Sequence, residues 1–207
     1  MGFIAVIDYD MGNLHSACKG LEKVGANPKV TDSTADLEAA DGIVLPGVGS
    51  FDPAMKQLRD RHLVEPIKAA IASGKPFLGI CLGLQLLFEH SEEGIESGLG
   101  IIPGKVRRFQ SEPGLTIPHM GWNALNLTQT DNALWQDLPT DPHVYFVHTY
   151  YVDPVDPQVT AATITHGQQT VTAAIAKENI MAVQFHPEKS ADLGLKMLSN
   201  FVKQVNG

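Results

Sequence analysis

One of the two cysteines stands in a glycine frame that is typical of an exposed nucleophile. Residues 79–83 read Gly-Ile-Cys-Leu-Gly, with Cys81 at the centre. The apolar residues 77–80 predict a strand, and residues 82–89 predict a helix. A sharp turn between them leaves no room for side chains beside the nucleophile, and the helix N-terminus favours a thiolate. Cys81 is therefore the candidate nucleophile; the alternative is a small buried core residue.

A histidine and a glutamate two residues apart can serve as a base and its orienter. His186 and Glu188 flank Pro187, directly after residues 180–185, whose apolar run predicts a strand. We expect extended backbone here, in which side chains two residues apart point to the same side. Glu188 could then hold the His186 ring while the ring takes the Cys81 proton, as in a catalytic triad. The alternative for the histidine is a surface or capping residue at a strand end.

Acyl transfer by such a triad also needs hydrogen-bond donors for the oxyanion that forms when the cysteine attacks a carbonyl. The backbone N–H of Leu82, directly after the nucleophile, is one expected donor. Residues 46–51 read Pro-Gly-Val-Gly-Ser-Phe after the apolar run 42–45, and this loop is expected to supply another. The loop lacks the Lys-Ser/Thr pair of a phosphate-binding loop and the third glycine of a dinucleotide fingerprint. A plain turn is the alternative.

The remaining residues predict neither a metal site nor a bound cofactor. The eight histidines are scattered, and the sequence has no H-E-x-x-H or C-x-x-C motif. His143 and His148 are spaced in a way that suits no common ligand pattern. The second cysteine, Cys18, lies on the apolar face of a predicted helix, where it would pack as a small core residue.

The elements that must position these residues form two different halves. In the first half, predicted strands at residues 3–8, 28–31, 42–45 and 77–80 alternate with helical patterns. Such alternation predicts a parallel sheet covered on both faces. The helical pattern over residues 52–72 is expected to break near Pro66. The second half predicts strands that extend the same sheet, before a final helix over residues 191–205; these strands are 106–109, 122–127, 144–152, 159–165, 170–176 and 180–185.

The composition fits one domain that spans residues 1–207. The chain has 43% hydrophobic residues, and its 15 Lys and Arg against 23 Asp and Glu give a net charge of −8. An acidic chain without a Lys/Arg cluster is a poor partner for nucleic acid or an anionic membrane. No apolar run approaches the roughly 18 residues of a membrane span, and the N-terminus lacks a signal-peptide pattern. With only two cysteines, we expect a reduced, cytoplasmic protein.

With these motifs in this order, the chain resembles the class I (triad) glutamine amidotransferases along essentially its whole length. Among them it is similar to the glutaminase subunits of imidazole glycerol phosphate synthases. The finer resemblance is carried by residues 8–14 (DYDMGNL), 46–51 (PGVGSF), 79–88 (GICLGLQLLF), 118–123 (PHMGWN), 145–151 (YFVHTYY) and 186–190 (HPEKS). Two positions depart from the family's pattern. Asp10 stands where glycine is more common, and Thr149 replaces the usual serine but keeps the hydroxyl.

The resemblance implies a fold and a reaction. The fold is flavodoxin-like α/β with three layers, a central mixed, mostly parallel sheet and a β-rich second half. In the reaction, Cys81 attacks the side-chain amide of glutamine, ammonia leaves, and a γ-glutamyl thioester is hydrolysed. The implied triad is Cys81, His186 and Glu188, and the implied oxyanion donors are the backbone N–H groups of Val48, Gly49 and Leu82. The implied glutamine site comprises Gly47, Gly49, Gln85, Thr149 and Tyr150.

Helix geometry also places Gln85 on the side of the nucleophile, one turn further on; the alternative is an exposed helix residue. Two glycines flank Val48, so its peptide could rotate at a low steric cost. We expect the Val48 N–H to be turned away from the oxyanion until a partner is loaded.

That partner is also implied by the resemblance. It is a cyclase subunit with a (β/α)8 barrel, which uses the ammonia on a phosphorylated ribulosyl-imidazole substrate to make imidazole glycerol phosphate in histidine biosynthesis. The implied docking edge comprises Asn13, Pro118, Met120, Trp122, Tyr145 and Lys189. Met and Trp are enriched at interface centres, and core packing is the alternative for them.

Other functions stay open on the residues alone. A stand-alone flavodoxin-like thiol hydrolase or peptidase would turn over many amides or esters without a partner. A glutaminase subunit could serve another synthase. A non-catalytic binding module could have kept the same fold, although the set of Cys81, His186 and Glu188 counts against it.

Overall fold

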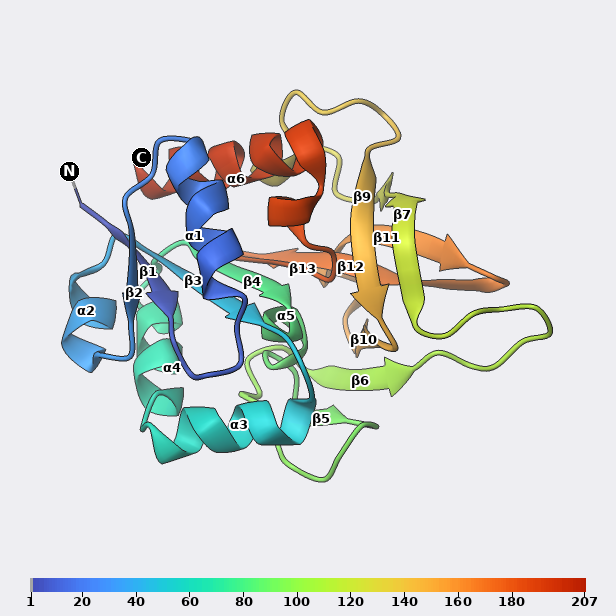
Figure 1. Cartoon of the computed structure of the whole chain (residues 1–207), viewed down its shortest axis with the longest axis horizontal. Helices are drawn as coiled ribbons and strands as arrows, with labels where there is room; N and C mark the ends of the chain where they lie inside the picture. The colour runs from blue at the N-terminus through green and yellow to red at the C-terminus, as the bar shows by residue number, and fades with distance from the viewer. Residues whose placement is uncertain (1) are drawn as a thin grey trace.

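The computed structural model describes residues 2–207, and its main feature is a mixed sheet with helices on both faces (Figure 1). Five parallel strands lie side by side in the order β2-β1-β3-β4-β13. Their bounds are β1 Ile4–Ile7, β2 Pro28–Thr31, β3 Gly42–Gly47, β4 Phe77–Cys81 and β13 Ile180–Val183. Every residue of the four strands β1, β3, β4 and β13 is buried, as expected for parallel strands that are covered on both sides.

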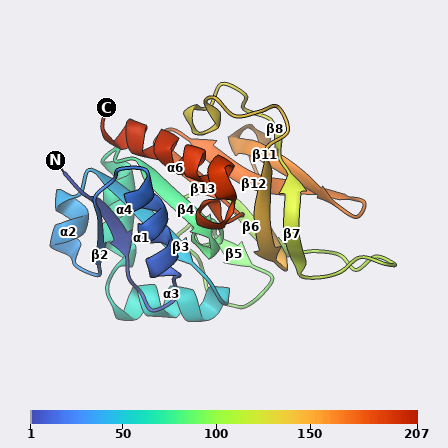
Figure 2. The same cartoon turned by 45° about the horizontal axis from the view of Figure 1, so that its top comes forward.

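The helices divide between the two faces of this sheet (Figures 1 and 2). One face carries α1 Leu14–Lys23 and α6 Ala191–Val205, and the other carries α2 Thr34–Ala39, α3 Phe51–Asp60 and α4 Val64–Ala72. Two clusters of buried apolar side chains fill the corresponding layers. The observed α6 has the bounds that its apolar spacing predicts. Cys18 is half-buried on α1 against the core, as expected.

The second half extends the sheet with antiparallel strands beyond β13, in the order β12-β10-β6. Short β5 closes that edge, and β11 and β8 pair beyond β12. The strands are β5 His90–Ser91, β6 Gly104–Arg108, β8 Asn126–Leu127, β10 Tyr150–Pro154, β11 Thr160–His166 and β12 Gln169–Lys177. Two further strands, β7 His119–Ala124 and β9 His143–His148, form a separate antiparallel pair.

The expected strand over residues 144–152 is in fact two strands. The chain leaves β9 at Thr149 and enters β10, which pairs with different neighbours in the main sheet. A continuous apolar run carries no signal for a change of pairing partner, so the periodicity alone could not reveal the break. The break is important for the site, because it turns residues 149 and 150 toward the end of β4. The expected strand over residues 122–127 is likewise divided between β7 and β8, and β7 and β9 form their own pair instead of extending the main sheet as expected.

Helix boundaries also differ from the sequence prediction. The expected break near Pro66 lies earlier, between α3 and α4, and Pro66 sits in the first turn of α4, where its missing N–H costs no hydrogen bond. The helix expected over residues 82–89 is only the single turn α5 Leu82–Gln85. Helix α2 was not predicted. No helix within residues 2–207 is long and apolar enough to cross a membrane.

Candidate active site

Cys81 lies on a sharp turn where β4 meets α5. Its φ is 56° and its ψ is −109°, a conformation that costs free energy for any residue with a Cβ. The flanking glycines let the backbones approach closely: a Cβ at Gly83 would overlap the carbonyl oxygen of Leu45 in β3, and a Cβ at Gly79 would lie 2.9 Å from the carbonyl oxygen of Gly83. The steric reason inferred for the glycine frame therefore holds in the structure.

His186 and Glu188 are joined by a hydrogen bond of 2.8 Å between Nδ1 and Oε1, and both side chains are almost fully buried. The expected extended backbone is wrong here. Residues Pro187–Lys189 form the 3-10 turn η3, and His186 precedes it in an extended conformation. Proline favours such a turn at its first position, so the turn brings the two side chains together. The hydroxyl of Ser190 donates to the carbonyl of His186 over 2.7 Å and stabilises the same turn.

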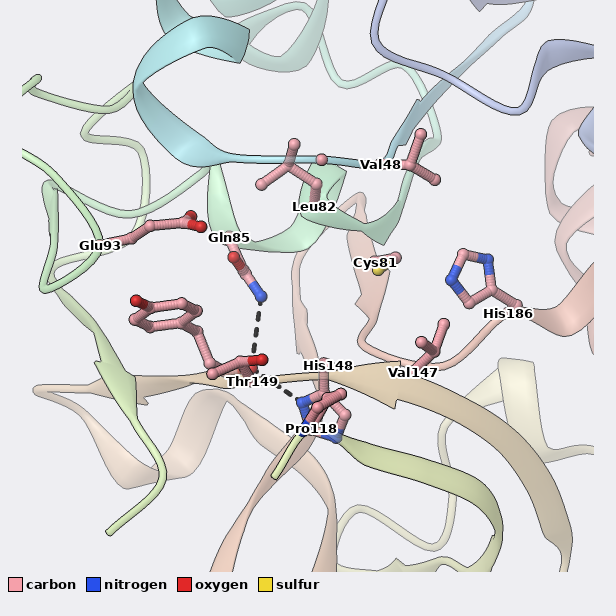
Figure 3. A pocket seen from close by; sticks show the side chains of 12 residues that line it. Val48, Cys81, Leu82, Gln85, Glu93, Pro118, Val147, His148, Thr149 and His186 are labelled. Atoms are coloured by element: carbon pink, nitrogen blue, oxygen red, sulfur yellow. Dashed lines mark hydrogen bonds between the residues drawn. The ribbon is translucent and has the colours of Figure 1, made fainter. Parts of the chain in front are cut away.

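The electrostatics of the pair suit a ring that exchanges a proton with the nucleophile. Burial by itself lowers the pKa of the His186 ring, but the neighbouring Cys81 and Glu188 favour its protonated form and raise the pKa to about 9. Because Nδ1 donates to Glu188, Nε2 is the nitrogen left for chemistry, and it has no hydrogen-bond partner within residues 2–207. Figure 3 shows the His186 ring beside Cys81 at the wall of a cavity.

This cavity has a volume of about 310 Å³, which falls within the range of small-molecule sites. It brings together most of the residues expected for a site: Val48, Gly49, Cys81, Leu82, Gln85, Pro118, Thr149, Tyr150 and His186. Gly47 is not among the lining residues, because it packs behind them against Tyr9 and Leu82. Glu188 also lies behind the wall, where it contacts the His186 ring.

The Leu82 and Val48 N–H groups, both expected as oxyanion donors, differ in whether they are already hydrogen-bonded. Leu82 begins α5, so its N–H has no partner within the helix and remains available beside the sulfur. The Val48 N–H instead donates to the carbonyl oxygen of Met11 over 2.6 Å. This agrees with the expectation that the N–H is turned away in the chain without a partner. The Val48 peptide must rotate before its N–H can reach an oxyanion in the cavity.

Gln85 is buried rather than exposed, so the alternative of a solvated helix residue is wrong. Its Nε2 donates to the carbonyl oxygen of Tyr150 over 3.3 Å and to Oε1 of Gln184 over 3.1 Å. The Gln184 amide lies in turn 3.7 Å from Sγ of Cys81. Gln184 is not among the residues predicted from the sequence. It lies two residues before His186, and in extended backbone such side chains point to the same side, so the spacing could have indicated it.

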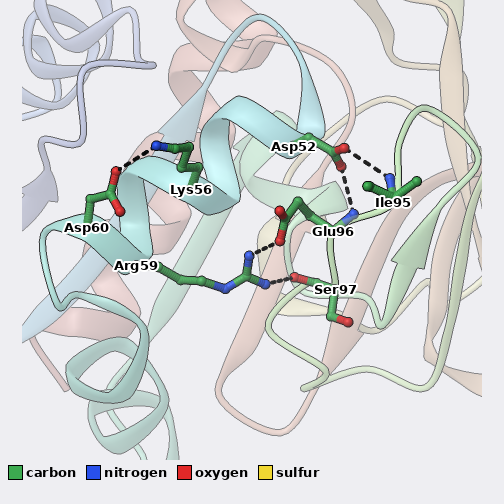
Figure 4. A network of polar contacts seen from close by, with 7 residues as sticks. All are labelled: Asp52, Lys56, Arg59, Asp60, Ile95, Glu96 and Ser97. Atoms are coloured by element: carbon green, nitrogen blue, oxygen red, sulfur yellow. Dashed lines mark hydrogen bonds and ion pairs between the residues drawn. The ribbon is translucent and has the colours of Figure 1, made fainter.

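Three residues line the cavity without having been predicted as site residues: Glu93, Val147 and His148. Of these, Glu93 carries a charge, and polar contacts hold its loop (Figure 4). Its Oε2 accepts from the backbone N–H of Phe51 over 2.8 Å. The carboxylate of Asp52 accepts from the N–H groups of Ile95 and Glu96 over 2.9 and 3.0 Å. Arg59 further pairs with Glu96 and with the carbonyl of Ser97. Glu93 thus presents a carboxylate to the cavity, where it can bind an ammonium group.

The residues expected at a docking edge are mostly at the surface. Met120 and Trp122 on β7 are 63% and 53% exposed, which excludes the alternative of core packing for both. The Trp122 ring meets the half-buried Tyr145 ring of β9 edge to face, with centroids 6.2 Å apart. Pro118 is exposed at the cavity rim and Lys189 is exposed in η3. Asn13 is partly buried and caps α1, where its side chain accepts from Ser16.

Comparisons with known proteins fit this fold and geometry. The family model described as "Glutamine amidotransferase class-I" matches residues 5–205, and the chain belongs to this family. Within it, the imidazole glycerol phosphate synthase subunit HisH of Microcystis aeruginosa is 76% identical over 205 residues, covering 99% of this chain and 97% of that protein. The same subunit from Synechocystis is 70% identical, covering 99% and 98%. The resemblance found in the sequence is therefore confirmed.

Solved structures with much lower identity share the fold. PurLQS from Thermotoga maritima has a TM-score of 0.77 at 21% identity, covering 99% of both chains. A structure described as a glutamine amidotransferase has a TM-score of 0.75 at 18% identity and covers both chains completely. The predicted fold class, an α/β fold with a mixed, mostly parallel sheet, is confirmed.

Replacing Glu188 by glutamine tests the role of its charge. The Glu188→Gln ring should lose its proton at a lower pH, because the carboxylate that favours imidazolium is gone. We expect glutamine hydrolysis to fall by about 10²-fold or more, and the alkaline limb of its pH profile to move to lower pH. Steady-state rates measured from pH 6 to pH 10 check both. The exposed Glu65→Gln variant serves as the control, and an unmoved alkaline limb in Glu188→Gln would contradict the assignment.

Proposed function

We propose that this chain hydrolyses glutamine to glutamate and ammonia and supplies the ammonia to a cyclase partner that makes imidazole glycerol phosphate in histidine biosynthesis. The proposal rests on one observation: Cys81, on its sharp turn, and His186, which is hydrogen-bonded to Glu188, line the same cavity. Membership of the class I glutamine amidotransferases and the identity to HisH subunits support the choice of glutamine. A broad thiol hydrolase or a binding module would not explain that identity.

The reaction follows from the geometry in two halves. Nε2 of His186 takes the proton of the Cys81 thiol, and the sulfur attacks the amide carbon of the glutamine side chain. When the tetrahedral intermediate collapses, the C–N bond breaks and ammonia leaves with the proton that His186 returns. A water molecule, deprotonated by the same ring, then attacks the γ-glutamyl thioester and releases glutamate. Glu188 holds the ring in the required orientation throughout.

The cavity offers groups that suit the polar ends of a glutamine molecule. The carboxylate of Glu93 is placed to bind the α-ammonium group. Oε1 of Gln85 accepts no hydrogen bond within residues 2–207, because the Gln85 contacts use its Nε2, and it can accept one from the substrate. Thr149 lies on the opposite wall (Figure 3), and its neighbour Tyr150 also lines the cavity. We assign glutamine binding to these residues together with Gly49, and we give Gly47 a packing role.

The proposed partner is a cyclase subunit with a (β/α)8 barrel, bound as a heterodimer. The subunit name of the relatives supports an assembly, and the exposed Met120 and Trp122 beside the cavity supply a surface for it. Pro118, Tyr145, Lys189 and Asn13 are proposed to complete the docking edge. Docking there would place the partner close enough to receive ammonia and to release the Val48 N–H from Met11.

We further propose that residues 1–207 act as one glutamine amidotransferase domain in the cytoplasm, without a metal or cofactor. Both cysteines are unpaired, and a reducing compartment keeps a nucleophilic thiol active. The chemistry above uses only protein groups, glutamine and water.

Removal of the nucleophile tests the proposed reaction. We expect Cys81→Ala to lower glutamine turnover by more than about 10³-fold, because no thioester can form. Cys18→Ala removes the other thiol and should leave turnover unchanged. Ammonia release measures the rate, and mass spectrometry of the quenched protein detects the glutamyl adduct on Cys81. Substantial turnover by Cys81→Ala would overturn the proposal.

Truncation of an exposed aromatic residue tests the docking edge. We expect Trp122→Ala to weaken binding of the cyclase subunit about 30-fold, as for a central interface residue, without loss of helix or sheet content. Val30→Ala changes an exposed apolar residue on β2, at the opposite end of the sheet, and should bind normally. Isothermal titration calorimetry compares the two. Equal affinities for both variants would place the interface elsewhere.

A further inference from the structure

The sulfur of Cys81 has a polar neighbour outside the triad. Gln184 follows β13, and its side chain is fully buried. Its Nε2 lies 3.7 Å from Sγ, within the range of a hydrogen bond to sulfur. An amide that is buried beside a reacting atom needs hydrogen-bond partners, because burial of a polar group without a partner costs free energy. Both ends of the Gln184 amide have partners, Gln85 at the oxygen and Cys81 at the nitrogen.

The neighbours of Gln184 fix which end of its amide meets the sulfur. The carbonyl oxygen of Tyr150 can only accept, so Gln85 must present its NH₂ group to it. The same NH₂ group donates to Gln184, which must therefore present its oxygen to Gln85. The NH₂ group of Gln184 is left for Cys81. Turning the Gln184 amide over would bring two NH₂ groups together and would leave the sulfur without a donor.

A second set of hydrogen bonds holds the Tyr150 carbonyl from the other side (Figure 3). Nδ1 of His148 donates to this oxygen over 2.8 Å, and Nε2 of His148 accepts from Nδ1 of His119 over 3.0 Å. The amide of Asn123 lies 3.3 Å from the remaining nitrogen of His119. Burial lowers the pKa of both rings, to about 3 for His148 and about 4 for His119, so both are neutral near pH 7. The Tyr150 carbonyl is thus a fixed acceptor.

We propose that Gln184 is a catalytic residue that donates a hydrogen bond to the Cys81 thiolate, and that Gln85 is the positioning residue that orients its amide. The proposal rests on the proposed function and adds a residue to the triad. A donor to a charged sulfur stabilises the thiolate more than the thiol, so the nucleophile is available at lower pH. Gln85 then has two roles, one toward the substrate through Oε1 and one toward the sulfur through Gln184.

The pH dependence of Cys81 alkylation by iodoacetamide tests the donor directly. The experiment uses the full chain carrying Cys18→Ala, so that Cys81 is the only thiol. Gln184→Met keeps the length of the side chain but removes its N–H donor. We expect the midpoint of the alkylation profile to rise by about one pH unit, and kcat for glutamine to fall about tenfold with a smaller change in KM. Gln184→Glu keeps the volume and places a negative charge near the sulfur, so it should raise the midpoint further.

Two more variants separate a role at the sulfur from a structural role. Gln85→Met should raise the midpoint by less than Gln184→Met, and the double variant should add nothing, because Gln85 acts on the sulfur only through Gln184. Gln204→Met is the matched control. Gln204 lies on α6, and its amide also contacts a sulfur, Sδ of Met181, over 3.4 Å. This control should leave both the midpoint and kcat unchanged.

The outcomes for this residue and for the proposed function are distinct. Circular dichroism shows whether Gln184→Met and Gln184→Glu are folded. If either folded variant keeps the alkylation midpoint of the parent chain, the donor role is overturned, even if glutamine turnover is intact. If Gln184→Met does not fold, the isosteric Gln184→Glu decides. If the parent chain does not hydrolyse glutamine with its partner, the proposed function is refuted. If the Gln184 variants nevertheless show raised alkylation midpoints, the donor role stands.

Discussion

The close approach of three backbone segments around Cys81 is the constraint on which the rest of the site depends. The positive φ of Cys81 turns the chain from β4 into α5 within one residue. The turn brings residue 83 against the carbonyl of Leu45, where only a glycine, without a Cβ, fits. The turn raises the sulfur above the carboxyl edge of the sheet and starts a helix beside it. The free N–H of Leu82 is a consequence of the same turn.

Strand order then brings the other groups to the sulfur. Pairing of β4 with β13 on one side aligns Ile80 with Val183, so the segment with Gln184 and His186 leaves the sheet next to Cys81. Pairing with β3 on the other side aligns Cys81 with Gly47, which places the Val48 loop there. Ligands bind at the carboxyl edge of parallel strands for this reason. The rest of the lining comes from elsewhere: the far wall lies where the chain passes from β9 to β10, and Glu93 and Pro118 reach the cavity from other loops.

The sequence was sufficient for features that local sterics determine. The glycines around Cys81, the neighbouring His186 and Glu188, and the apolar face of α6 each have a reason within a few residues. Features set by distant contacts could not be predicted. Glu93 reaches the cavity because its loop binds α3, more than 40 positions earlier in the chain. The partner of the Val48 N–H is a carbonyl on another loop, and no residue type specifies it.

We propose that the free chain holds a complete triad but lacks one oxyanion donor, because the Val48 N–H is bonded to Met11. The most direct measurement is the rate of glutamine hydrolysis by the chain alone and by its complex with the cyclase subunit and that subunit's ligand. We expect the complex to be faster by about 10²-fold or more, as for the gain of one oxyanion donor. A free chain that already hydrolyses glutamine at the rate of the loaded complex would contradict the claim.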